Sequence, residues 1–111
     1  MKKFWAGGFL YHLKNNCVLL HKRDSNTIFN PNSWAFFGGL NEGEETPVDC
    51  FIREINEEIG VKFATQEVIT LYDYFNEEFQ THRFVFYALS EKIKFEFVLN
   101  EGADFDWVPI D

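Results

Sequence analysis

The chain has 111 residues, a hydrophobic fraction of 46% and a formal net charge of −8, so we expect one domain over residues 1–111 with a single core. The negative charge argues against a long nucleic acid as partner, because proteins that bind one normally present a basic patch. No apolar run approaches the roughly 18 residues of a membrane span, and Cys17 and Cys50 are interpreted as small buried thiols, so we expect a cytoplasmic location.

The first part of the chain is predicted to form a β-hairpin followed by a loop. Residues 3–12 and 17–22 are apolar runs separated by Lys-Asn-Asn, and asparagine tolerates the positive φ of a tight turn. Residues 23–33 are mostly polar and favour a loop. Residues 34–37 then predict a short strand, which we expect to end at the two glycines of residues 38–39.

The clearest element is a helix that begins after Thr46. Threonine is a fair N-cap, Pro47 suits the first helical position, and Asp49 completes a variant of the capping box. Gly60 is expected to end the helix. Apolar residues at helical spacing predict one buried stripe; they are Val48, Phe51, Ile52, Ile55 and Ile59.

The rest of the chain favours strands. Aromatic and β-branched residues are frequent in residues 61–63, 67–74, 82–89 and 93–99, and a last short apolar stretch covers residues 105–110. One strong helix among many strands predicts an α+β or mixed α/β domain.

Three carboxylates share the polar side of the predicted helix. Glu54, Glu57 and Glu58 are spaced i, i+3 and i+4, and like charges at this spacing destabilise an isolated helix. A hard divalent cation would offset that repulsion, because carboxylate oxygens are its preferred ligands. The alternative is a solvated acidic face without function, which is the usual meaning of a surface charge run.

The spacing around these carboxylates resembles the Nudix box. Gly39, five residues, Glu45, seven residues and then Arg-Glu-Ile-Asn-Glu-Glu-Ile-Gly-Val fill every fixed position of that pattern over residues 39–61. Average residue usage gives such a match by chance about once in 10⁹ starting points. The resemblance implies an α/β/α sandwich around a mixed β-sheet and hydrolysis of nucleoside diphosphates linked to another group X.

The resemblance also implies a metal site. Glu54, Glu57 and Glu58 would bind Mg²⁺, with Mn²⁺ as a substitute, and the backbone carbonyl of Gly38 would add a ligand. Gly39 would permit the tight loop beside the substrate. Phe37 departs from the family pattern, which usually has proline at this position, so the loop lacks the stiffness that a fixed φ would give.

Four further residues receive roles from the resemblance. Arg53 would orient the catalytic carboxylates by charge-assisted hydrogen bonds, and Glu45 would brace the loop or reach the metal through water. Glu101, six residues before a tryptophan, is a candidate metal ligand or general base, or else an ordinary loop carboxylate. Arg23 is a candidate phosphate contact, or else a solvated cation. The general base is Glu54 or Glu101.

Nucleoside triphosphates, nucleotide sugars and ADP-ribose all remain open as substrates, and the products would be a nucleoside monophosphate and phosphate-X or pyrophosphate. The alternative function is a domain that senses a nucleotide without cutting it.

Trp34, Phe36 and Phe37 could stack on a base, although aromatic residues at this density usually form core. His82 and Arg83 are interpreted as surface residues of a strand edge and are left outside the site.

The last expectation concerns assembly. Members of the family usually continue into a second long helix, whereas this chain stops at residues 107–111. An uncovered sheet face would expose more apolar surface than monomers usually tolerate. We therefore expect the chain to cover that face by forming a homodimer.

Overall fold

The structure is a computed structural model, and it describes residues 3–22, 34–92, 97 and 104–110. Its elements in chain order are β1 (Phe4–His12), β2 (Cys17–Lys22), β3 (Trp34–Ala35), β4 (Phe37–Leu40), α1 (Pro47–Ile59), the 3₁₀ turn η1 (Thr65–Glu67), β5 (Ile69–Asn76), β6 (Thr81–Leu89) and β7 (Asp104–Pro109). This is the mixed α and β composition that the sequence predicts.

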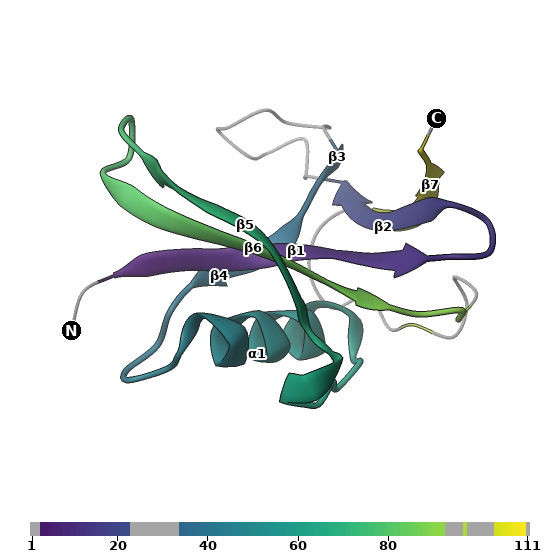
Figure 1. Cartoon of the computed structure of the whole chain (residues 1–111), viewed down its shortest axis with the longest axis horizontal. Helices are drawn as coiled ribbons and strands as arrows, with labels where there is room; N and C mark the ends of the chain where they lie inside the picture. Colours follow the sequence, from purple (N-terminus) through teal and green to yellow (C-terminus); the bar gives the residue numbers. More distant parts are fainter. Residues whose placement is uncertain (1–2, 23–33, 93–96, 98–103, 111) are drawn as a thin grey trace.

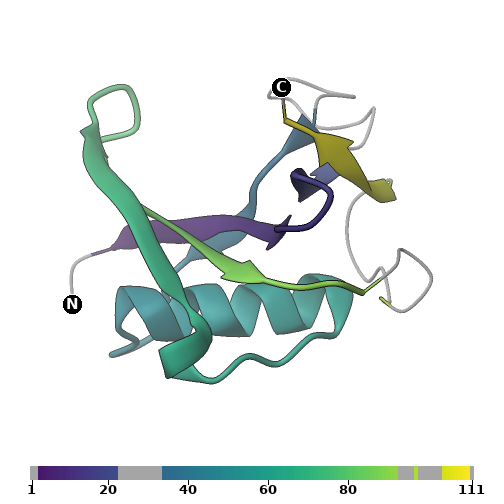
Figure 2. The same ribbon diagram turned by 45° about the vertical axis from the view of Figure 1, so that its right-hand side comes forward.

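The strands form one mixed sheet. Its order is β3-β2-β1-β6-β5, with β4 paired to β1 and β7 paired to β2. β1 is antiparallel to β2 and to β4 but runs parallel to β6. Figures 1 and 2 show α1 lying along one side of this sheet, across β1, β4 and β6.

The helix begins and ends where the sequence predicts. The side chain of Thr46 accepts a hydrogen bond from the backbone N–H of Asp49 at 3.2 Å, and Pro47 opens the first turn. Gly60 adopts the left-handed conformation with φ 71° and donates its N–H to Asn56. A left-handed residue ends a helix because it turns the chain away from the axis, and glycine does so without a steric penalty.

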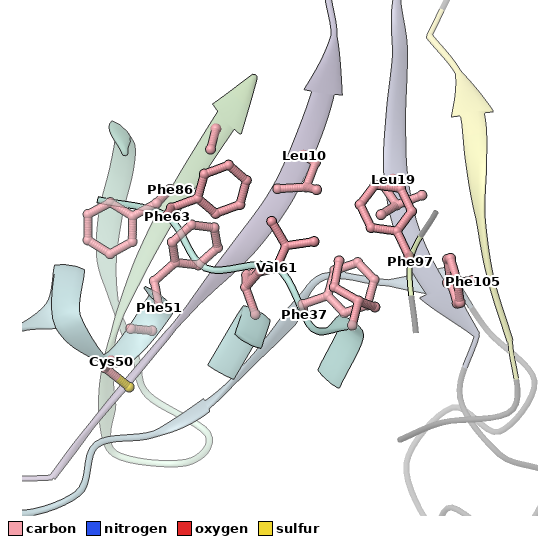
Figure 3. Close-up of a cluster of buried hydrophobic side chains, with 14 residues drawn as sticks. Leu10, Leu19, Phe37, Cys50, Phe51, Val61, Phe63, Phe86, Phe97 and Phe105 are labelled. Atoms are coloured by element: carbon pink, nitrogen blue, oxygen red, sulfur yellow. The ribbon is translucent and has the colours of Figure 1, made fainter. Parts of the chain in front are cut away.

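The core lies between α1 and the sheet. Phe51, Ile55 and Ile59 of the predicted stripe are fully buried, and Val48 and Ile52 pack at its margin. Figure 3 shows their neighbours from the strands converging on the same cluster; they include Leu10, Leu19, Phe37, Phe86 and Phe105. Burial of these side chains is the main force that holds the helix on the sheet.

Several predicted strand boundaries differ from the structure. Residues 38–39 lie inside β4 instead of ending a strand, because both glycines pair with β1. Residues 61–63 form no strand, although Val61 and Phe63 are buried in the core. The loop predicted for residues 23–33, and all of the strand predicted for 93–99 except Phe97, lie outside the described residues.

The two cysteines differ in environment. Cys50 is fully buried, as predicted, whereas Cys17 is only partly buried at the start of β2 and donates to the carbonyl of Asn15. Cys17 faces the turn of the hairpin and not the core, so the prediction of a buried thiol was wrong for this residue.

Within the described ranges, no helix combines the length and the apolar character needed to cross a membrane.

Candidate functional site

Arg53 is the centre of the predicted site. Its Nε donates to Glu45 Oε2 at 2.7 Å and its Nη2 donates to Glu45 Oε1 at 3.1 Å, which makes a bidentate pair. Nη1 donates to Glu54 at 3.0 Å and to Glu57 at 3.1 Å, and Nη2 also reaches the carbonyl of Leu40 at 3.1 Å. The five donors of a planar guanidinium allow one side chain to fix two helix carboxylates and the preceding loop together.

Glu45 connects this arginine to the loop before the helix. Its Oε1 accepts the backbone N–H of Glu42 at 2.8 Å, in addition to the bonds from Arg53. The hydrogen bond from Arg53 lowers the pKa of the Glu45 carboxyl below its ordinary value of 4.5. The same bond raises the pKa of Arg53. Both groups are therefore charged at neutral pH, and Glu45 contacts both Arg53 and the loop before the helix.

The carboxylates of Glu58 and Glu54 lie beside the glycines of β4. Glu58 Oε2 accepts the backbone N–H of Gly38 at 3.0 Å, and the residue is only 5% exposed. A side chain at Gly39 would collide with the Glu54 carboxylate. A residue with a side chain at position 39 would therefore displace the Glu54 carboxylate from its place beside the strand.

Burial separates this cluster from an ordinary acidic surface. The side chain of Glu54 is 13% exposed and that of Glu57 45% exposed, while Glu58 is buried. A solvated acidic face would leave all three in water, so that alternative is wrong for Glu54 and Glu58. Burial of a carboxylate is costly unless hydrogen bonds or a cation compensate it.

Cys50 lies beside the same loop. Its thiol contacts the carbonyl of Gly39 at 3.6 Å and receives a weak hydrogen bond from Arg53 at 3.8 Å. Burial raises the pKa of this thiol to about 12, with nearby carboxylates acting in the same direction. Cys50 is thus a neutral packing group at physiological pH and not a nucleophile.

The cluster suits a hard divalent cation. In the described part of the chain, the Arg53 guanidinium lies within ion-pair distance of four carboxylates, those of Glu42, Glu45, Glu54 and Glu57. As the side chains stand, no three His, Cys, Asp or Glu residues of the described ranges surround one point. Mg²⁺ commonly takes one or two protein carboxylates and fills its remaining positions with water and phosphate oxygens. The donor set therefore fits Mg²⁺ without a closed protein cage.

Two predicted site residues cannot be placed. Arg23 and Glu101 lie outside the described residues, so their proposed roles stay predictions. The N–H of Gly38 donates to Glu58, and the metal-binding role expected for its carbonyl stays a prediction. The sequence reasoning did not single out Trp5, whose indole lies against Gly38 from the other side of the strand. The sequence signal for Trp5 was that it stands two positions before Gly7 in an alternating strand, so that the two residues share one face of the sheet.

Comparison with known proteins places this arrangement in a family. The family model described as the NUDIX domain matches residues 3–111. A MutT/nudix family protein from Enterococcus faecalis is 21% identical with a TM-score of 0.76, and the match covers 96% of this chain but only 43% of that one.

Two other solved structures share the fold. A MutT structure, described with the Aliivibrio salmonicida and Vibrio cholerae proteins, is 18% identical with a TM-score of 0.77. The match covers 98% of this chain and 81% of that one. The NUDIX domain of Shewanella oneidensis NrtR, complexed with ADP ribose, is 21% identical with a TM-score of 0.69. The match covers 96% of this chain and 71% of that one. These findings confirm the predicted fold class. The chain belongs to the Nudix domain family.

Proposed function

We propose that the chain is a Mg²⁺-dependent hydrolase of a diphosphate linkage in a nucleoside diphosphate-X compound. The observation that supports it most directly is the carboxylate cluster of α1, which Arg53 organises against the two glycines of β4. The family match over residues 3–111 supports the same reaction class. The ADP ribose bound to the Shewanella oneidensis domain supports a small nucleotide as the substrate.

Glu54, Glu57 and Glu58, with the carbonyl of Gly38, would hold Mg²⁺ or Mn²⁺ in this site. A bound divalent ion supplies neutralisation of diphosphate charge and a lower pKa for water. The ion would also relieve repulsion between the carboxylates and the polyanionic substrate, because the chain itself carries a net charge of −8.

The residues of the chain position the reaction and move its proton. Arg53 holds Glu54 and Glu57 in fixed orientations through Nη1, which favours a single arrangement of the acidic groups. The oxygen of water forms a bond to one phosphorus, and the bond from that phosphorus to the bridging oxygen breaks. The proton from water passes to a carboxylate, Glu54 or Glu101, and the bridging oxygen leaves as part of a phosphate.

The cellular setting is part of the proposal. We infer a cytoplasmic location, supported by two cysteines that are both free in the described structure.

The homodimer expected from the sequence stays a prediction for sedimentation measurements. The exposed apolar side chains on the edge strand β5 support it; they are Ile69, Leu71, Tyr72, Tyr74 and Phe75.

Hydrolysis of a compound panel tests the function. Nucleoside triphosphates, nucleotide sugars and ADP-ribose are incubated with Mg²⁺, and nucleoside monophosphate is measured by chromatography. Glu57→Gln should lower kcat on any active compound by about 100-fold while the fold is retained. Glu78→Gln, an exposed carboxylate on the β5–β6 turn, is the control. No hydrolysis of any compound would favour nucleotide sensing, and a fully active Glu57 variant would contradict the metal site.

A further inference from the structure

Three consecutive residues of β4 contact the charged groups of the proposed site. The N–H of Gly38 donates to Glu58 at 3.0 Å, and the carbonyl of Leu40 accepts a hydrogen bond from Arg53 at 3.1 Å. Between these two residues, Gly39 lies against a second helix carboxylate. The position of this short strand therefore sets where the arginine and the two carboxylates stand relative to one another.

The indole of Trp5 covers the same strand on the opposite face of the sheet. A Cβ at Gly38 would lie 2.6 Å from the indole Cζ2 and 2.6 Å from the carbonyl oxygen of Ala6. Gly7 is the register partner of Gly38 on β1, and a Cβ there would also meet the indole. The ring therefore rests on a stretch of backbone that has no side chains of its own.

Arg83 holds the indole from the neighbouring strand β6. Its guanidinium carbon lies 4.0 Å from the centroid of the Trp5 ring, and the two residues are register partners across the parallel β1–β6 pair. A cation over the face of a tryptophan ring at this distance is attractive. Both residues are partly buried, so water screens the attraction less than it would at an open surface. The ring is therefore fixed from β6 while it lies on β4.

β4 depends on this support because its own side chains give it little packing after Phe37. The strand has four residues, and among the described strands it pairs only with β1. Gly38 and Gly39 have no side chain to pack, and Leu40 is 51% exposed. Loss of the indole would leave a void beside these glycines, into which the strand could move. A shift of about 1 Å can cost an enzyme site about 100-fold in rate.

We propose that Trp5 is a positioning residue for the metal-binding carboxylates and acts through the backbone of Gly38 and Gly39. Its indole keeps β4 in place, which fixes the N–H that Glu58 accepts and the backbone beside which Glu54 lies. Removal of a group that orients metal ligands usually lowers metal affinity or activity by about 10- to 100-fold. The inference rests on the proposed function, because it assumes that these carboxylates bind a divalent ion.

Binding of Mn²⁺ without any nucleotide tests the proposal apart from catalysis. Mn²⁺ is titrated into the full chain, and the free ion is measured by electron paramagnetic resonance. Trp5→Ala should raise the Kd for Mn²⁺ about tenfold. Phe9→Ala is the matched control and should leave this Kd unchanged. Phe9 is also a partly buried aromatic residue of β1 on the same face, but its ring packs on Phe36 and Tyr87.

Hydrogen exchange of the Gly38 amide is a second readout, and it needs no metal. The amide should exchange about tenfold faster in the Trp5→Ala variant, because its bond to Glu58 opens more often when β4 is less firmly held. The amide of Gly60, which donates to Asn56 at the end of α1, should exchange at an unchanged rate. A general loss of stability would instead accelerate both amides.

Trp5→Phe keeps the test valid if the alanine variant does not fold. Phenylalanine retains a ring for Arg83 but lacks the indole atoms Cζ2 and Cη2, which lie nearest to Gly7 and Gly38. The Kd for Mn²⁺ should therefore rise by about threefold, less than in the alanine variant. With an active nucleotide, the Mg²⁺ concentration for half-maximal rate should rise in the same order, while KM at saturating Mg²⁺ should be unchanged.

The outcomes separate this inference from the proposed function. Unchanged Mn²⁺ affinity in both Trp5 variants would overturn the inference, and so would equal acceleration of the Gly38 and Gly60 amides. A raised KM with unchanged Mn²⁺ affinity would make Trp5 a substrate contact and would also overturn it. Each of these results leaves the proposed function standing if the unmodified chain binds Mn²⁺ and hydrolyses a nucleotide. No Mn²⁺ binding by the unmodified chain would contradict the proposed metal site, and the inference would fall with it.

Discussion

The substitution Glu45→Gln tests whether the bond between the loop and Arg53 stabilises the fold and the site. Glu45 accepts three hydrogen bonds, two from Arg53 at 2.7 and 3.1 Å and one from the N–H of Glu42 at 2.8 Å. Glutamine has nearly the same shape but offers a single acceptor oxygen and no charge. Its amide NH₂ would face one of these donors, so at least one bond is lost and the others weaken.

The size of the effect follows from the partial burial of the pair. A hydrogen bond to a charged group contributes about 1.5 to 3 kcal/mol when it is shielded, and the Glu45 and Arg53 side chains are 19% and 20% exposed. With a discount for contact with water, we expect a loss of about 2 kcal/mol in the free energy of unfolding. At about 4 °C per kcal/mol for a domain of this size, Tm should fall by about 8 °C.

The pH dependence of this difference has a definite sign. The pKa of Glu45 in the folded chain is lowered from 4.5, so the folded state binds its proton less readily than the unfolded state. The stabilisation is fully present above pH 4.5 and is lost as the pH falls through the lowered pKa of the folded state. The gap in Tm between the unmodified chain and the Glu45→Gln variant should stay constant from pH 7 to about pH 5 and then close in acid.

Thermal unfolding followed by circular dichroism measures both effects. Glu44→Gln removes the same charge from the neighbouring exposed position and is the control, for which Tm should hardly change. Hydrolysis of an active compound should also slow in the Glu45→Gln variant, because Arg53 loses the partner that fixes its orientation. Equal Tm values for the two variants at pH 7, or a gap that widens in acid, would refute the reasoning.

Three other substitutions or modifications probe the same region. Arg53→Lys keeps the charge but not the planar fork, so kcat should fall at least about tenfold and Tm should fall as well; unchanged kinetics would rule out its orienting role. Glu58→Gln keeps an acceptor oxygen for the N–H of Gly38, so Tm should be nearly retained while kcat falls about 100-fold, whereas Glu58→Ala should lower both. Alkylation should modify Cys17 before Cys50, as followed by mass spectrometry, because the buried Cys50 thiol has a pKa of about 12. Equal rates of modification for the two cysteines would show that the loop beside Cys50 opens readily.

The sequence alone determined the features that depend on local spacing. Thr46 and Gly60 mark the ends of α1 because a cap is a contact between residues only a few positions apart. The common face of Glu54, Glu57 and Glu58 follows from the period of the helix. The spacing of residues 39–61 also identified the family, which the family match confirms, since the motif is contiguous in the chain.

The tertiary structure decided what depends on close approach between distant segments. The register of β1 with β4 and β6 places Trp5 against Gly38 and beside Arg83, and no local pattern fixes that register. Sequence reasoning therefore assigned Arg83 to the surface and left the role of Trp34 open. A strand pattern shows which side chains share a face, but which neighbour lies opposite is set by long-range pairing and by the packing of the helix beneath.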